Sequence, residues 1–341
     1  MSEWGADVLG DEFEQLTLPL ADDDEGEVVA TLVRALPADA PEPGFWERLT
    51  SRLLRRRPAP PMLHDVDVLY VHGWSDYFFQ KRLARFWTSR GARFFALDLR
   101  KYGRSLRDGQ TPGYVGDLGV YDEDIAAALG EMRTREQGRR LVLLGHSTGG
   151  LTLSLWAARH PWEVAALILN SPWLEFQLGP LRAAIAPVVG LGARLRPYDA
   201  APQIDLGFYA RAQLEVADPD DVMTVDPTWR PEHSMSVHAG WLNAVLAGHA
   251  TVSAGMHIDA PICMLLSARS VVPTRWSDAL TGADSVLVVD DVARAALKLG
   301  PSITIERIDG ALHDVFLSRR EARDEAYARL ERWVTGWALS R

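Results

Sequence analysis

Short apolar runs alternate with amphipathic stretches from about residue 67 to the end of the chain. The runs have the length of buried strands and lie at 68–71, 93–97, 141–144, 164–169, 261–266 and 302–308. Stretches with helical spacing separate them, chiefly at 78–90, 121–133, 151–159, 292–299 and 320–339. Strands that alternate with helices predict an α/β fold, with a mostly parallel sheet flanked by helices on both faces.

The first 61 residues follow a different pattern. Residues 13–20 and 28–36 are partly β-branched runs on either side of an acidic turn, and they predict an antiparallel hairpin. The hairpin belongs to an acidic N-terminal segment, 1–36, which we expect to join the core, with residues 1–11 loose. The Pro- and Arg-rich stretch 37–61 predicts a solvated linker helix; a short basic helix at a membrane surface or an acidic partner is the alternative.

The alternation of strands and helices stops between residues 174 and 255. This segment has many prolines, an apolar stretch at 181–195 and helical patches at 208–216 and 237–247. Because strands resume only near Ile262, we interpret the segment as a helical cap inserted between two halves of a core domain, 62–173 and 256–341. The alternative is that it simply completes the core.

Composition and charge exclude several classes of protein. The chain has 341 residues and a net charge of -10, and residues 1–27 contain ten acids but no Lys or Arg. We expect this acidic start to solvate a surface segment, and the lack of a broad basic face argues against nucleic acid as a partner. No apolar run reaches the roughly 18 residues of a transmembrane helix, and no basic-then-apolar leader predicts secretion, so we expect a cytoplasmic protein. Cys263 falls in an apolar run and is expected to be a small core residue.

The most specific chemistry lies at residues 141–150, where an apolar run leads into Gly145-His146-Ser147-Thr148-Gly149-Gly150 and then a helical pattern. Gly-x-Ser-x-Gly between a strand and a helix is the context of a nucleophile elbow. The two outer glycines make room for a tight turn, which holds Ser147 in a strained conformation with its hydroxyl exposed. The N–H of Thr148, at the start of the helix, points at the same space and can help to hold a negative oxygen. A glycine-rich turn that only packs tightly is the alternative.

Four motifs together carry a resemblance to a known family. They are His72-Gly73-Trp74, Asp98-Leu99-Arg100-Lys101-Tyr102-Gly103-Arg104-Ser105, Gly145-His146-Ser147-Thr148-Gly149-Gly150 and Gly310-Ala311-Leu312-His313-Asp314. In this order, over about residues 62–338, the chain resembles the α/β-hydrolase family, and most of all its serine aminopeptidase/monoacylglycerol-lipase-like group. The resemblance implies a helical cap, His313 as the base that accepts the Ser147 proton, and the N–H of Trp74 as the second donor of an oxyanion hole. We also expect His72, Gly73 and His146 to line the substrate pocket.

The orienting acid departs from the family pattern. An Asp is expected a few residues beyond the strand that ends near Leu266, where this chain has Ser270. About a dozen inserted residues then precede Asp284-Ser285-Val286-Leu287, which resembles the family's acid followed by two apolar residues. We therefore assign the acid to Asp284, with Asp290 and Asp291 as alternates and Asp278 less favoured. Asp314 adjoins His313 and is poorly placed to bond to the ring of its own neighbour.

These residues predict a serine hydrolase that cleaves carboxylic esters, either a monoacylglycerol or a simple acyl ester, through an acyl-enzyme and a Ser147–Asp284–His313 triad. The expected partner is a small ester with an apolar acyl group, as suggested by the apolar residues of the cap, Leu181, Ile185, Val188, Val189 and Leu191. No metal or other cofactor is expected. The sequence does not indicate the oligomeric state. A peptidase or amidase on the same fold is one alternative, and a catalytically silent binding module, suggested by the displaced acid, is another.

Overall fold

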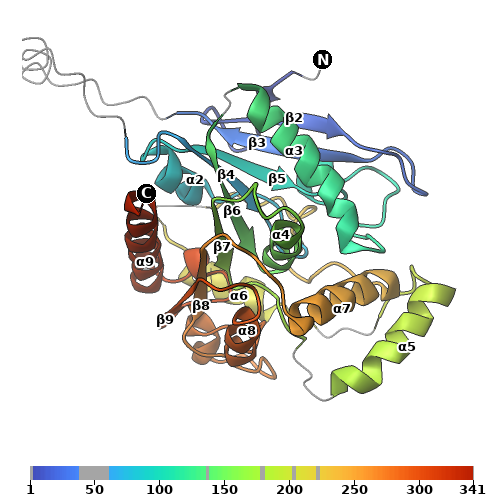
Figure 1. Cartoon of the computed structure of the whole chain (residues 1–341). Helices are drawn as coiled ribbons and strands as arrows, with labels where there is room; N and C mark the ends of the chain where they lie inside the picture. Colours follow the sequence, from blue (N-terminus) through green and yellow to red (C-terminus); the bar gives the residue numbers. More distant parts are fainter. Residues whose placement is uncertain are drawn as a thin grey trace, which may run out of the picture.

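The structure is a computed structural model, and it describes residues 3–37, 61–135, 138–176, 181–201, 205–219 and 223–340. Within these residues one mixed sheet forms the centre of the molecule, and its nine strands lie in the order β1-β2-β3-β5-β4-β6-β7-β8-β9 (Figure 1). All neighbouring strands from β5 to β9 run parallel, whereas β1, β2 and β3 add an antiparallel edge. The predicted α/β fold is therefore confirmed. The predicted linker helix in 37–61 lies outside the described residues.

The strands of the sheet follow the apolar runs of the sequence. They are β1 (Gly5–Ala6), β2 (Phe13–Pro19), β3 (Val29–Ala35), β4 (Val66–Val71), β5 (Arg93–Asp98), β6 (Arg140–His146), β7 (Ala166–Asn170), β8 (Ile262–Ser267) and β9 (Ile303–Ile308). Alternate side chains of each central strand enter opposite layers: Leu69 belongs to one hydrophobic cluster and Tyr70 to the other. Continuous apolar runs are required because the central strands are covered on both faces.

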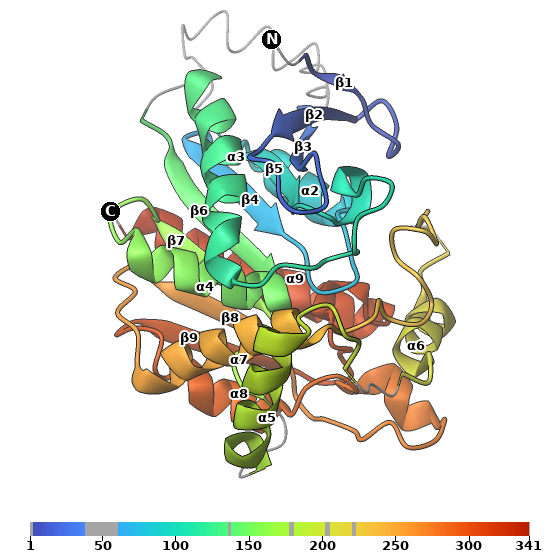
Figure 2. The ribbon, with the colours of Figure 1, turned by 90° about the vertical axis from the view of Figure 1, so that its right-hand side faces the viewer.

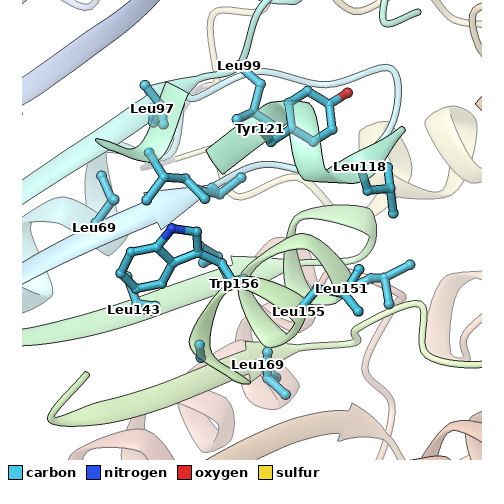
Figure 3. Packing of buried hydrophobic residues seen from close by; sticks show 14 of the residues in the cluster. Leu69, Leu97, Leu99, Leu118, Tyr121, Leu143, Leu151, Leu155, Trp156 and Leu169 are labelled. Atoms are coloured by element: carbon cyan, nitrogen blue, oxygen red, sulfur yellow. The ribbon is translucent and has the colours of Figure 1, made fainter. Parts of the chain in front are cut away.

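Helices cover both faces of the sheet. They are α2 (Lys81–Thr88), α3 (Tyr121–Arg135), α4 (Thr148–Arg159), α5 (Leu181–Leu195), α6 (Phe208–Val216), α7 (Ala239–Ala254), α8 (Val289–Ala296) and α9 (Arg320–Leu339), with short 3₁₀ turns η1 (Gly103–Ser105), η2 (Leu118–Val120), η3 (Asp278–Gly282) and η4 (Val315–Leu317). In Figure 2, α3 and α4 lie in front of the sheet, and α2 and α9 lie behind it. Figure 3 shows Trp156 of α4 beside strand residues such as Leu69 and Leu143. This packing fixes α4, and with it the turn that precedes the helix.

The N-terminal hairpin is confirmed, but residues 1–11 are more ordered than expected. In the described part of this stretch, β1 pairs with β2, and the Asp7 side chain is buried. Its carboxylate accepts hydrogen bonds from Arg104 Nε (2.6 Å) and Nη2 (2.9 Å). The expectation that the acidic start only solvates a surface is also wrong for Asp23 and Glu25, whose carboxylates lie 2.6 and 2.5 Å from the buried Lys101 Nζ. Lys101 and Arg104, which follow β5, need these carboxylates because an unpaired buried charge is costly.

Replacing Asp7 by alanine is expected to destabilise the protein by about 3 kcal/mol, because it removes one of two carboxylates from a buried guanidinium. The remaining partner is Asp98, whose Oδ2 lies 2.8 Å from Arg104 Nη1. Urea unfolding at neutral pH measures the effect. Asp11→Ala is the matched control, since Asp11 is an exposed acid of the same segment. A loss as small as that of the control would contradict the prediction.

Among the described residues between β7 and β8, three helices are present, α5, α6 and α7; the 174–255 segment was expected to be mostly helical. Helix α5 lies beside α7 at the edge of the molecule (Figure 1). Its residues Val188 and Leu191 are 70% and 59% exposed, so these two apolar side chains do not line an internal acyl site, contrary to our expectation. None of the described helices is both long and apolar enough to cross a bilayer. Cys263 is buried in β8, and burial raises the pKa of its thiol, as expected of a core residue.

Candidate active site

Ser147 occupies the turn between β6 and α4 with φ 51° and ψ -116°. A positive φ is strained for a residue with a side chain, so neighbouring contacts must hold it. The Ser147 N–H donates to the carbonyl of Asn170 (3.0 Å), at the end of the adjacent β7, and the Ser147 carbonyl accepts from the N–H of Trp173 (2.9 Å). The end of β7 and the segment that follows it therefore hold the strained residue from both sides of its backbone.

The two outer glycines of the turn are required by close backbone contacts. A Cβ at Gly145 would lie 2.7 Å from the Cα of Gly150, and one at Gly149 would lie 2.2 Å from the carbonyl oxygen of His72 and 2.5 Å from that of Val71. These separations are shorter than van der Waals contact. The carbonyl oxygens of His72 and Val71 belong to the backbone and have little freedom to move away from a Cβ at Gly149. The start of α4 thus packs directly on the end of β4.

Gly149→Ala is expected to destabilise the protein by about 3 kcal/mol, because the clash with two backbone oxygens outweighs the helix preference of alanine, which is worth about 1 kcal/mol. Gly130→Ala is the matched control. Gly130 lies in α3 with nothing within 4 Å of an added Cβ, so alanine there should stabilise by about 0.5–1 kcal/mol. Thermal unfolding should show a lower unfolding temperature for Gly149→Ala and a higher one for Gly130→Ala than for the parent. Equal effects in the two variants would show that the close contact does not control stability.

A histidine and a carboxylate from the second half of the chain meet beside the elbow. His313 Nδ1 lies 2.9 Å from Asp284 Oδ2, and both side chains are almost fully buried. Asp284 Oδ1 accepts from the N–H groups of Val286 (2.8 Å) and Leu287 (2.7 Å). Because a carboxylate accepts, His313 Nδ1 carries the hydrogen and Nε2 has a free lone pair. Nε2 is buried and has no hydrogen-bond partner among the described residues, so its lone pair is available to accept a proton.

Asp284 reaches this position through the inserted loop after β8. The loop begins after Ser267, the last residue of β8, and returns so that Ser270 and Asp284 form a parallel bridge. The Asp284 N–H donates to the carbonyl of Arg269 (3.0 Å), and the Asp284 carbonyl accepts from Val271 (2.8 Å). The acid therefore lies directly beside the position where the family pattern places it.

The other acids considered for this role have different partners. Asp290 Oδ1 lies 2.7 Å from Arg307 Nη1, and Asp291 pairs with Arg294. Asp278 lies in η3, and the carboxylate of Asp314 binds Gln80 and Asn170. Among the described acids, Asp284 is the one hydrogen-bonded to His313.

The loop after β4 lies against the elbow. A Cβ at Gly73 would lie 3.0 Å from the Cβ of Ser147, so only glycine allows this approach without a shift. The next N–H, that of Trp74, has no acceptor among the described residues, and neither has the N–H of Thr148. Two donors without acceptors among the described residues therefore lie on segments that flank Ser147; that they form an oxyanion hole stays a prediction.

The two histidines expected beside the substrate both form hydrogen bonds with nearby backbone groups. His72 Nδ1 donates to the Gly73 carbonyl (2.7 Å), and its Nε2 accepts from the N–H of Leu99 (3.1 Å), so its ring braces the loop after β4. His146 Nδ1 donates to the Asn170 carbonyl (3.1 Å), and its ring centre lies 5.0 Å from that of His313. Burial lowers the pKa of His146, although the nearby Asp314 acts in the opposite direction. That these residues line a substrate pocket stays a prediction.

The 174–255 segment contributes two aromatic residues that the sequence did not single out. Trp241 of α7 packs against Trp74 with ring centres 3.7 Å apart and ring planes tilted by 39°, and Tyr209 of α6 lies edge-on to His313 at 5.7 Å. The only signal for them in the sequence was their place on helical patches of the expected cap. Within the described part of the chain, no group of three or more His, Cys, Asp or Glu residues is arranged to hold a metal.

Comparison with known proteins identifies the family of the chain. Residues 64–319 match the model of the family described as serine aminopeptidase, S33. A monoacylglycerol lipase of Mycolicibacterium smegmatis is 27% identical over 252 residues, which are 73% of this chain and 81% of that protein. The fold is similar to that of the Paleococcus ferrophilus monoacylglycerol lipase, with a TM-score of 0.58 and 19% identity over 80% of this chain and 94% of that one. It is also similar to a soluble variant of Saccharomyces cerevisiae monoglyceride lipase in complex with a substrate analogue, with a TM-score of 0.62 and 14% identity over 94% and 96% of the two chains.

The fold, the elbow and the order of its motifs define an α/β-hydrolase. Within that class the chain belongs to the serine aminopeptidase S33 family, in the branch that resembles the monoacylglycerol lipases.

Proposed function

We propose that this hydrolase cleaves carboxylic esters, a monoacylglycerol or a simple acyl ester, through an acyl-enzyme formed on Ser147. The observation that carries the proposal is the geometry of the His313 imidazole. Asp284 holds its Nδ1 at 2.9 Å, and its Nε2 is buried with no partner in the part of the chain that the structure describes. A serine hydroxyl is a weak nucleophile unless a base accepts its proton, and Nε2 is the available base.

The proposed mechanism has two halves. Ser147 Oγ attacks the ester carbonyl as His313 Nε2 takes its proton; the bond from carbon to the leaving oxygen then breaks, and His313 gives the proton to the leaving alkoxide. Water repeats the sequence on the acyl-enzyme and releases the acid. The negative oxygen in each half is held by the N–H groups of Trp74 and Thr148, and each such donor contributes about 10²–10³ in rate. Asp284 stabilises the imidazolium.

The 174–255 segment acts as the cap over this site. Its Tyr209 packs against His313, and its Trp241 packs against Trp74 in the loop after β4. The apolar group of the substrate accordingly meets the indoles beside the elbow rather than the outer face of α5. We include Trp173, which follows β7 and lies 6.1 Å from Trp241 between ring centres, among these indoles.

The family description favours a second candidate, a serine aminopeptidase. Such an enzyme binds the free amine of its substrate, for which a carboxylate of the cap beside the site is the expected partner. The cap residue in contact with His313 is the neutral Tyr209. Two acids of the same segment have other partners: Asp205 binds Ser234 (2.6 Å), and Asp218 binds Arg320 (2.8 Å). These contacts support the esterase, and the return of Asp284 to the family position supports an active enzyme over a silent module.

A fluorophosphonate probe followed by a substrate panel tests the proposal. The probe should label the parent protein, because it reacts with activated serines whatever the natural substrate is. The panel contains aryl esters of increasing acyl length, a monoacylglycerol and an aminoacyl anilide. Turnover of the esters but not of the anilide is expected. Turnover of the anilide alone would decide for the aminopeptidase, and no labelling of the folded protein would support the silent module.

A further inference from the structure

The loop after β4 contacts the cap at each position from 74 to 77. The loop residues and their cap partners are Trp74 with Trp241, Ser75 with Met235, Asp76 with Arg230, and Tyr77 with Asp226. The partners move back along the chain as the loop advances, so the loop and the cap segment 226–241 run in opposite directions. The first of these positions carries the N–H of Trp74, which is the second expected donor of the oxyanion hole.

Two backbone N–H groups of this cap segment bond to hydroxyls of the loop. The N–H of Met235 donates to Ser75 Oγ (3.0 Å), and the N–H of Asp226 donates to the Tyr77 hydroxyl (2.8 Å). Ser75 is buried and has a φ of 54°, a strained value for a residue with a side chain. Because Ser75 directly follows Trp74, the cap contact that holds Ser75 also restricts the backbone at Trp74.

Arg230 joins this loop to the helix that lies beside the base. Its Nε lies 2.8 Å from Asp76 Oδ1, and its Nη2 donates to Gln213 Oε1 in α6 (2.6 Å). Tyr209, which packs edge-on to His313, lies one helical turn before Gln213. One guanidinium therefore connects the loop of the expected oxyanion donor to the helix that contacts the base.

The ion pair of Arg230 and Asp76 has little access to solvent. The two side chains are 16% and 7% exposed, respectively. A pair that water reaches freely contributes little, whereas a buried charge that loses its partner is costly. The pair therefore favours one placement of the cap relative to the loop. Outward movement of the cap would separate the two charges and would also break the hydrogen bonds to Ser75 and Tyr77.

We propose that Arg230 is a positioning residue for the proposed ester hydrolysis: through Asp76, and together with the hydrogen bond from Met235 to Ser75, it holds the N–H of Trp74 where the negative oxygen forms. The inference rests on the proposed function. A displaced cap would leave the nucleophile and the base in place but would remove one oxyanion donor. An ion pair that only anchors the cap over the substrate would change substrate binding and not the chemical step.

Steady-state turnover of an aryl acetate separates these two roles, because an acetyl group gains little from apolar contacts with the cap. Arg230→Met keeps a long side chain and removes its charge. We expect kcat to fall about 10- to 100-fold with KM within about threefold of the parent, since the loss of one oxyanion donor costs about 10²–10³ in rate. A raised KM with an unchanged kcat would identify an anchor for substrate binding only and would overturn the proposal.

Arg211→Met is the matched control. Arg211 is an arginine of the same cap helix, its Nε lies 3.0 Å from Glu215 Oε1, and its side chain is 50% exposed. Because an exposed ion pair contributes little, both kcat and KM should match those of the parent. A fall in kcat as large as that of Arg230→Met would show a general effect of removing charge from the cap, contrary to the proposal.

Ser75→Ala is the second variant and decides the matter if Arg230→Met does not fold. It removes the hydroxyl that accepts from the N–H of Met235 and leaves the ion pair intact. We expect kcat to fall about 3- to 10-fold with KM unchanged, because one of the two ties beside Trp74 is lost. An unchanged kcat would again overturn the proposal.

The parent and Ser147→Ala separate this inference from the function on which it rests. Ester turnover that is present in the parent and absent from Ser147→Ala, together with an unchanged kcat in Arg230→Met and Ser75→Ala, would refute the role of Arg230 alone. No turnover and no fluorophosphonate labelling of the folded parent would refute the proposed function itself.

Discussion

Ser147→Ala is expected to abolish covalent labelling and to lower ester turnover by about 10⁶-fold, with the fold intact. The loss is this large because the acyl-enzyme forms on the Oγ that the variant lacks, and the donors of Trp74 and Thr148 supply only the residual rate. Alanine adds no atom to the tight turn, so the close contacts of the elbow glycines are unchanged. Intact-protein mass spectrometry after probe treatment, with thermal unfolding alongside, measures both parts.

Ser171→Ala is the matched control for that experiment. Ser171 follows the adjacent strand, is fully buried and also has a positive φ, of 45°. Its hydroxyl is buried without a partner among the described residues, so its removal is close to neutral for stability. This variant should keep its label. Labelling that survived in Ser147→Ala would assign the reactive group to another residue and end the serine hydrolase proposal.

Asp284→Asn has the second largest expected effect, a loss of about 10⁴-fold in labelling rate near neutral pH. Asparagine can still accept from Val286 and Leu287 through its oxygen, which leaves its NH₂ group facing His313 Nδ1. Two donors do not bond, so the imidazole moves its hydrogen to Nε2 and loses the lone pair that must accept the Ser147 proton. The variant therefore retains its fold with the base in the wrong tautomer.

Asp290→Asn and Asp291→Asn are the comparison variants, because these residues were the other candidates for the acid. Each pairs with an arginine, Arg307 and Arg294 respectively, and their replacement should leave the labelling rate within a factor of about two of the parent. Rates from a probe time course across pH 6–9 give the comparison. A large loss in either of these variants, with a normal rate in Asp284→Asn, would reverse the assignment.

The sequence alone determined those features that depend on neighbouring residues. Runs of apolar residues fixed the strands, since a strand covered on both faces admits few polar side chains, and helical spacing placed α6 and α9 at their observed bounds. The elbow could also be predicted from residues that are close together in the sequence. Gly145, Ser147 and Gly149 lie within five residues, and the tightness of the turn requires small residues at those positions.

Other parts of the site depended on contacts between distant segments, which no local pattern encodes. The acid was narrowed to three positions by resemblance, and the loop that returns to Ser270 brought Asp284 to His313. The acidic start was expected to be solvated because a charge count does not show that Arg104 and Lys101 need buried partners. The apolar residues of α5 were expected inside because hydrophobicity does not specify which face of a peripheral helix has a neighbour.

The sequence therefore determined the fold class, the elbow and the identity of the candidate base. Only the tertiary structure decided which carboxylate meets His313, which aromatic residues of the cap approach the elbow, and that Asp314 and Asn170 tie the loop after β9 to the elbow. The physical reason is that strand and turn preferences act over a few residues. Hydrogen bonds to a buried carboxylate, by contrast, join groups that lie up to 234 positions apart in the chain, as Gln80 and Asp314 do.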